Sequence, residues 1–211
     1  MALALFGVVG FVVLAQAFVR GGLVVSFDDD VARWMAANAP DAVVRVARVT
    51  TYFGGVFGVV VGVAIAVAGL LRAGQRTDAV FVVVAVAGIL IIVPVLKAVY
   101  ERARPDEGSA IPLPHTYSFP SGHAATAVVL YGALGVLLAT RARSRRWAAG
   151  WLLAAIVTAL AVGASRVILN VHFVSDVVAG FAVGLAWLCV CLVVRDVVRS
   201  DPVRATPVSP S

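Results

Sequence analysis

Two cationic side chains in the middle of the chain are spaced so that they could bind one anion. Lys97 and Arg104 stand seven residues apart in the segment Lys97–Pro105. Seven residues is close to two turns of an α-helix, so the two cations share a face if the helix persists. Cations also snorkel at helix ends in membranes, so the pair alone is compatible with a membrane-edge anchor or with an anion site.

A second segment, Pro120-Ser-Gly-His123, has the residue types of an oxyanion site at the start of a helix. A helix N-terminus offers unpaired backbone N–H groups and the positive end of the helix dipole. Gly122 lets an anion approach the backbone, Ser121 adds a hydroxyl donor, and His123 could deliver a proton. We expect an oxyanion here, with a purely structural histidine as the alternative.

The third segment supplies a histidine and a carboxylate. His172 and Asp176 stand four residues apart, which stacks them on one face if both are helical. A carboxylate that accepts one imidazole N–H fixes the tautomer and leaves the other nitrogen free to attack or to take a proton. Arg166 precedes the histidine by six residues and would approach from the preceding turn.

The same residues could in principle ligate a metal ion, because His123, His172 and Asp176 are ligand types that bind zinc. The three cations of these segments would surround that metal with positive charge, which opposes cation binding. Three cations, a helix N-terminus and two histidines match an oxyanion better, so we expect no metal and no cofactor. His115, the third histidine, is expected to be exposed in a proline-rich loop.

The elements that must position these residues are membrane-spanning helices. The chain is 62% apolar and 13% charged, with a mean hydropathy of +1.01, against about 45–50% and about 25% in soluble domains. A water-soluble globule is therefore excluded. Six stretches without Asp, Glu, Lys or Arg approach or exceed the roughly 18–20 residues that cross a bilayer as a helix. They are 1–19, 49–71, 79–96, 108–140, 147–165 and 177–194.

These stretches predict an all-α fold, a polytopic six-transmembrane-helix bundle that forms a single domain over residues 1–200. The predicted spans are 2–19, 51–71, 79–99, a helix from Pro120, 147–165 and 174–195. The first is expected to be a retained span rather than an export signal, because no positive charge precedes it. The tail 201–211 is expected to be disordered.

The charges between the spans predict the orientation. With both termini cytoplasmic, the inner segments hold nine cations and three acids, and the outer segments hold eight of each. Positive charge retained on the cytoplasmic side is the usual rule, and it explains the net charge of +6 without a nucleic-acid partner. The chemistry-bearing segments would then face the extracytoplasmic side of the plasma (inner) membrane.

The segment 28–48 is too charged to cross a bilayer and is expected to lie along the outer interface. It opens with the acidic triplet Asp28–Asp30. The simplest interpretation of the triplet is a solvated boundary, and the alternative is a site for a cation or a lipid headgroup.

Taken together, the three segments resemble the signature of the type 2 phosphatidic acid phosphatase family of integral-membrane lipid phosphate phosphatases. That signature is Lys, six residues, Arg-Pro; then Pro-Ser-Gly-His; then Ser-Arg, five residues, His, three residues, Asp. The motif region 97–176 matches every element in order, with Lys97, Arg104, Pro105, Pro120, Ser121, Gly122, His123, Ser165, Arg166, His172 and Asp176. The family's site is also similar to that of vanadate-dependent haloperoxidases, but those enzymes are soluble and the hydropathy here argues against them.

The resemblance implies metal-free hydrolysis of a membrane lipid phosphate or diphosphate, such as phosphatidic acid, phosphatidylglycerol phosphate or a polyprenyl species, with release of inorganic phosphate. It implies that His172, oriented by Asp176, attacks phosphorus to form a phosphohistidine, and that His123 protonates the leaving oxygen and then activates water. The residues expected to bind the phosphate are Lys97, Arg104, Ser121, Gly122 and Arg166. Alternatives are a lipid phosphotransferase, or a transporter or structural membrane protein whose charges line a pathway.

Overall fold

A computed structural model describes residues 2–105, 108–113 and 115–200, so the predicted disorder of the tail lies outside the described residues. Within that part every regular element is a helix and there is no strand, which confirms the all-α prediction. The helices are α1 (Ala2–Arg20), α2 (Leu23–Asn38), α3 (Asp41–Thr51), the 3₁₀ turn η1 (Tyr52–Gly54), α4 (Val56–Arg72), α5 (Arg76–Tyr100), α6 (Gly122–Ala139), α7 (Arg145–Ile168) and α8 (Val174–Ser200).

Five of these helices are long and apolar enough to cross a membrane: α1, α5, α6, α7 and α8. The predicted second span is broken. Asp41–Gly54 and Val56–Arg72 qualify only as a pair, and they meet at a bend of 50°. The bend follows from the sequence, because α3 carries charges that α4 lacks until its last residue. The six-span prediction therefore holds if the bent pair counts as one span.

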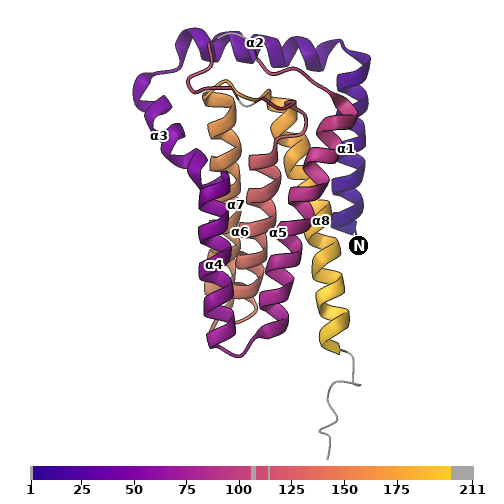
Figure 1. Ribbon diagram of the computed structural model, residues 1–211, viewed down its shortest axis with the longest axis vertical. Helices are drawn as coiled ribbons and strands as arrows, with labels where there is room; N and C mark the ends of the chain where they lie inside the picture. The colour runs from indigo at the N-terminus through magenta and orange to yellow at the C-terminus, as the bar shows by residue number, and fades with distance from the viewer. Residues whose placement is uncertain (1, 106–107, 114, 201–211) are drawn as a thin grey trace, which may run out of the picture.

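Helix α6 lies at the centre of the bundle, in contact with α5, α7 and α8, and α1 lies along α8 (Figure 1). Small residues permit the tightest approach, as is usual for helices in lipid. A Cβ placed on Gly180 or Gly184 of α8 would come within 2.5 Å and 2.6 Å of backbone oxygens of α6. The outward faces are apolar and exposed, with Phe57 at 76% and Ile91 at 67% exposure, as expected of surfaces that contact lipid.

Helix α2 lies across one end of the bundle, which we call the α2 end (Figure 1). The residues of the predicted interfacial segment divide between α2 and α3, and α3 slopes from α2 down to α4. The last turns of α5 and α7 and the first turns of α6 and α8 all lie at the α2 end. This alternation brings the three chemistry-bearing segments to one end of the molecule.

Candidate active site

The connection between α7 and α8 places the histidine of the third segment. The N–H groups of Asn170 and Val171 donate back to carbonyls of the last turn of α7 at 2.9 Å and 3.2 Å, and the second of these carbonyls belongs to Arg166. This is the Schellman pattern of helix termination, and Asn170 has the left-handed conformation that it requires, with φ 51°. His172 follows directly, so the cap sets its position relative to Arg166.

Asp176 meets His172 through the start of α8 and not along a helix. Because α8 begins at Val174, the expectation that the two residues share a helical face is wrong. The Oδ2 atom of Asp176 instead accepts the N–H of Phe173 at 3.0 Å and lies 3.3 Å from Nδ1 of His172. A carboxylate at the third helical position bonding the cap N–H is the geometry of a capping box. His172 and Asp176, four residues apart, therefore still form a pair, although His172 lies before the helix.

The His172 ring has one nitrogen free for chemistry. His172 and Asp176 are 3% and 0% exposed. With Nδ1 donating to the carboxylate, Nε2 carries the lone pair, and Nη1 of Arg104 lies 3.2 Å from it. Burial first, and then the neighbouring cations Arg104 and Arg166, hold the pKa of His172 well below its ordinary value. The ring is therefore neutral at neutral pH, as a nucleophile must be.

Arg104 reaches the histidine from a loop. The chain leaves α5 at Glu101, which has φ 46°, so the helix does not persist to Arg104 and the condition for a shared helical face is not met. The Arg104 guanidinium donates to the Thr116 carbonyl at 2.8 Å and to the Val171 carbonyl at 2.6 Å. It thereby joins the loop before α6 to the connection before α8.

Lys97 joins the same cluster from the last turns of α5. Its ammonium group donates to the carbonyl of Tyr117, and to that of Ser118 at 3.4 Å. Arg104 also donates to the Tyr117 carbonyl, at 3.3 Å. One helical and one loop cation therefore converge on the same short stretch of chain.

The second segment starts α6, two residues later than predicted. Ser121 and not Pro120 is the N-cap, and its side chain makes no capping bond. The Ser121 N–H donates to the carbonyl of Asp176 at 2.9 Å. Contrary to expectation, this N–H is therefore not available to a ligand. The unpaired N–H groups of a helix start begin at the next residue, Gly122. The Ser121 hydroxyl is buried and has no hydrogen-bond partner within the described residues.

His123 lies in the first turn of α6, beside the broken span. A Cβ on Gly54 would stand 3.3 Å from the His123 Cβ, and one on Gly55 would stand 3.5 Å from its Nε2. The bend between α3 and α4 therefore runs close past the imidazole. His123, in the first turn of α6, and His172, in the connection before α8, therefore both lie at the α2 end of the bundle.

Arg166 occupies the last turn of α7 and is 2% exposed. Its Nη1 donates to the hydroxyl of Thr51 at the end of α3. Its Nε is buried and has no hydrogen-bond partner in the part of the chain that the structure describes. Sequence reasoning missed Thr51, because a threonine at the edge of an apolar run carries no signal of its own.

The three cations Lys97, Arg104 and Arg166 form no ion pair with a carboxylate of residues 2–105, 108–113 or 115–200. Buried positive charge without a counter-ion is costly, and the cluster can lower that cost by binding an anion. Within the same residues, no three His, Cys, Asp or Glu side chains are grouped so as to hold a metal ion. The described donors therefore suit an oxyanion.

One member of the acidic triplet belongs to this end of the molecule. Asp28 is 1% exposed and pairs with Arg102 at 2.8 Å, so interpreting it as part of a solvated boundary is wrong. Asp30 does lie at the surface, where it pairs with Arg33. Sequence reasoning also missed Arg102, whose signal was its place two residues before Arg104.

A groove of about 840 Å³ opens beside the cations Lys97 and Arg104. Its other wall residues include Val93 and Pro94 of α5 and Leu113 of the following loop. His115 is exposed, as predicted. The cations therefore lie where an apolar wall meets the polar end of the bundle.

The fold and the site together define a multi-pass helical membrane protein with a cationic pocket around a histidine–aspartate pair. The chain belongs to the PAP2 superfamily, whose family model matches residues 78–199. This confirms the resemblance drawn from the three motifs.

Two curated proteins and one solved structure are similar to the chain. It is 41% identical over 95 residues to phosphatidylglycerophosphatase B of Bacillus subtilis. The aligned region covers 43% of this chain and 45% of that protein. It is 42% identical over 77 residues to undecaprenyl-diphosphatase of Sulfolobus acidocaldarius, which covers 36% and 32%. The matches thus span less than half the length of either relative.

The similar solved structure is a transmembrane PAP2-type phosphatidylglycerolphosphate phosphatase from Bacillus subtilis. It superposes with a TM-score of 0.87 at 25% identity, over 95% of this chain and 99% of that one. The arrangement of the helices is therefore that of a known membrane phosphatase.

Proposed function

We propose that this protein is a lipid phosphatase that hydrolyses a membrane lipid phosphate or diphosphate without a metal ion. One observation carries the proposal: Arg166 Nε and Ser121 Oγ are buried donors without partners, next to the His172–Asp176 pair. A buried donor left without an acceptor costs about 1–3 kcal/mol. The oxygens of a phosphoryl group would satisfy both donors.

Binding of the phosphoryl group uses charges that are already in place. Lys97, Arg104 and Arg166 would bind its non-bridging oxygens, together with the N–H groups that begin at Gly122 and the Ser121 hydroxyl. Arg104 now donates to Nε2 of the histidine, so it would turn from that nitrogen to a phosphate oxygen. Phosphoryl transfer is catalysed mainly by such positioning and charge stabilisation.

The first chemical step forms a phosphohistidine. Nε2 of His172 attacks phosphorus, and the bond between phosphorus and the leaving oxygen breaks. The N–H of Nδ1 stays on the Asp176 carboxylate, which stabilises the positive charge that develops on the ring. His123, in its protonated form, donates a proton to the leaving oxygen, so that a lipid alcohol leaves neutral and a lipid monophosphate, from a diphosphate, leaves with one negative charge fewer.

The second step returns the enzyme to its starting state. His123, now lacking that proton, takes one from water, and the resulting hydroxide attacks phosphorus. The phosphorus–Nε2 bond breaks, His172 regains its lone pair, and inorganic phosphate is released. Dividing one displacement into two easier ones is the advantage of a covalent intermediate.

The substrate class follows from the site's surroundings and from the relatives. The groove beside Lys97 has an apolar wall on α5, which suits a lipid whose chains stay in the bilayer while its phosphate reaches the cations. The names of the two relatives indicate one glycerophospholipid and one polyprenyl diphosphate. We assign this chain to the same broad class of lipid phosphates and diphosphates.

The proposed orientation places both termini in the cytoplasm and the α2 end outside the plasma (inner) membrane. The opposite end carries the arginine cluster Arg141–Arg146, which the positive-inside rule retains in the cytoplasm. Single-cysteine variants Tyr117→Cys and Arg143→Cys, made after replacing Cys189 and Cys191 with serine, test it in intact cells. A membrane-impermeant maleimide should label only the first. Labelling of the second alone would reverse the orientation.

The activity is tested by phosphate release from purified protein in detergent, over a panel of phosphatidic acid, phosphatidylglycerol phosphate and farnesyl diphosphate. We expect release from at least one substrate, undiminished by a chelator. With ³²P-labelled substrate, an alkali-stable and acid-labile phosphoprotein should form and should be absent from His172→Ala. Loss of all activity with the chelator would reject the metal-free mechanism, and no release from any substrate would reject the function.

A further inference from the structure

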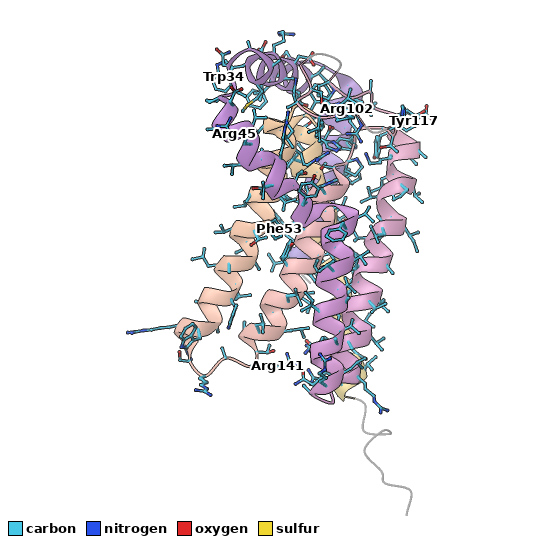
Figure 2. The ribbon with its side chains drawn as sticks, turned by 60° about the vertical axis from the view of Figure 1, so that its left-hand side comes forward. Trp34, Arg45, Phe53, Arg102, Tyr117 and Arg141 are labelled. Atoms are coloured by element: carbon cyan, nitrogen blue, oxygen red, sulfur yellow. The ribbon has the colours of Figure 1, made fainter. Side chains whose placement is uncertain are left out.

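A buried arginine lies on the far side of Asp176 from the proposed nucleophile. It is Arg102, one of the six residues that the first motif leaves unspecified between Lys97 and Arg104. Arg102 is the second residue after α5 and is 6% exposed. Its guanidinium lies between the rings of Phe18 and Phe173, at 4.6 Å and 4.1 Å from their centroids. Its backbone carbonyl accepts the N–H of Ser118 at 2.8 Å. The two ring contacts restrict the guanidinium, and the backbone bond fixes the stretch of chain that carries it. Figure 2 shows Arg102 near the α2 end of the bundle.

The two ends of this guanidinium bond two different carboxylates. Nη1 lies 2.8 Å from Oδ1 of Asp176, and Nη2 lies 2.8 Å from Oδ2 of Asp28. Nη1 also donates to the Ser175 hydroxyl at 2.7 Å. A planar guanidinium that bonds acceptors from both of its terminal nitrogens sets the orientation of those acceptors.

The arginine leaves the catalytic side of Asp176 to the histidine. Oδ1 of Asp176 bonds Arg102, while Oδ2 bonds Phe173 N–H and His172 Nδ1. Without the arginine, Oδ1 would be buried with no other hydrogen-bond partner among the described residues, and the carboxylate could rotate or take up a proton. Either change would remove the acceptor that fixes the tautomer of His172.

Asp28 ties this arrangement to α2. Its Oδ1 accepts the N–H of Ser175 at 3.0 Å, and its Oδ2 bonds the Ser175 hydroxyl as well as Arg102. The first turn of α8 is therefore capped by two carboxylates, one from α8 itself and one from α2. A continuous set of contacts leads from α2 through Arg102 and Asp176 to the histidine.

We propose that Arg102, held by Asp28, is a positioning residue for the reaction: it fixes the Asp176 carboxylate, which in turn fixes the tautomer and orientation of His172. The inference rests on the proposed function, since the effect is on the nucleophile. Replacing Arg102 should lower turnover and leave substrate binding almost unchanged, because the Arg102 side chain bonds no group of the proposed phosphate pocket.

The chain offers a matched control at the opposite end of the bundle. Arg195 is also buried, at 7% exposure, and its Nε lies 2.7 Å from the buried carboxylate of Asp78. It also lies over an aromatic ring, that of Phe81, at 5.6 Å. Replacing either arginine breaks a buried ion pair, but only the pair of Arg102 reaches the histidine.

The experiment measures kcat, KM and thermal unfolding on the fastest substrate of the panel. For Arg102→Gln we expect kcat to fall by about 100-fold while KM stays within about threefold, because only the orientation of a catalytic group is lost. Asp28→Asn should lower kcat by about tenfold, and Arg102→Lys should recover part of the activity. Arg195→Gln should lose thermal stability but keep kcat within about twofold.

Non-additivity decides whether Arg102 acts through Asp176. In single-turnover assays, Arg102→Gln added to Asp176→Asn should lower the rate by less than about threefold, because the shared partner is already gone. An undiminished 100-fold loss in that background would overturn the proposal, as would equal losses of kcat for Arg102→Gln and Arg195→Gln, or an effect on KM alone.

Two further outcomes separate this inference from the proposed function. If Arg102→Gln does not fold, the kcat of Asp28→Asn is compared with that of Arg195→Gln instead. A wild-type kcat in Asp28→Asn would overturn the proposal. If His172→Ala is fully active, the proposed function itself fails, whereas failure of this inference leaves His172→Ala inactive.

Discussion

Buried charge gathers at both ends of the bundle, and the two clusters are built differently (Figure 2). At the opposite end, three arginines converge on one buried carboxylate: Asp78 bonds Arg195 at 2.7 Å, Arg199 at 3.4 Å, and Arg141. Arg199 and Arg141 keep 48% and 32% of their side chains exposed, so water screens the excess charge.

At the α2 end, the carboxylates and most of the cations are separated. Asp28 and Asp176 share Arg102, while Arg166 is 2% exposed, has no carboxylate partner among the described residues and has an unpaired Nε. Arg166 is thus shielded from solvent and has no carboxylate beside it among the described residues. The opposite end therefore has the composition of a contact between helices, whereas the α2 end has that of the anion site proposed above.

The largest contrast is expected from the nucleophile. His172→Ala should lower kcat by more than about 1000-fold, since it removes the imidazole that Asp176 orients and that is proposed to form the covalent intermediate. Phosphate release is measured alongside thermal unfolding, which should change little. Activity within tenfold of wild type would break the comparison, because the α2 end would then not be the catalytic end.

The second contrast compares one arginine from each end. Arg166→Gln should lower kcat/KM by about 100-fold, the usual loss when one buried donor to a phosphoryl or oxyanion charge is removed. Arg141→Gln at the opposite end should remain within about twofold of wild type. Equal losses in the two variants would show that the clusters do not differ in function.

The third prediction uses the pH dependence of kcat/KM. Nearby cations disfavour the imidazolium form and so lower the pKa of His172, with Arg104 the largest contributor after burial. Removing that charge by Arg104→Gln should raise the pKa, so the acid limb of the profile moves to higher pH. The control is Arg33→Gln, an exposed arginine on α2, which should leave the limb unchanged. A shift to lower pH would contradict the assignment of the limb to His172.

The smallest effect on turnover, but a large one on stability, is expected at the opposite end. Asp78→Asn leaves several cations without their shared carboxylate, and breaking a buried ion pair costs about 3–5 kcal/mol. For a chain of this size that lowers Tm by about 10 °C, while kcat at 25 °C should stay within about twofold. A loss of turnover in the folded variant would mean that the two clusters are coupled.

Several features of the site could be predicted from sequence because they depend on spacing. Alternating spans place the ends of α5 and α7 and the starts of α6 and α8 on one side, so Lys97, His123 and His172 lie at the same end of the bundle. The four-residue spacing of His172 and Asp176 also forms a pair, although through a capping box in place of the expected helical face. Two different local geometries satisfy the same spacing.

The residues that sequence reasoning missed depend on tertiary contacts. Asp28 lies 74 positions from Arg102 and 147 from Ser175, and a run of three acidic residues is normally solvated. Thr51 contacts Arg166 across 115 positions, by way of the bend between α3 and α4. No local periodicity encodes which acidic residue of a run turns inward.

The termination of α7 has a further consequence. One hairpin-like turn of the backbone carries both the Arg166 carbonyl and the residue that precedes His172, linked at 3.2 Å. The backbone positions of Arg166 and His172 are therefore linked within one short turn, independently of how α7 and α8 tilt relative to each other. A change in the tilt of the spans would move these two residues together, whereas Lys97 and His123 lie on other helices.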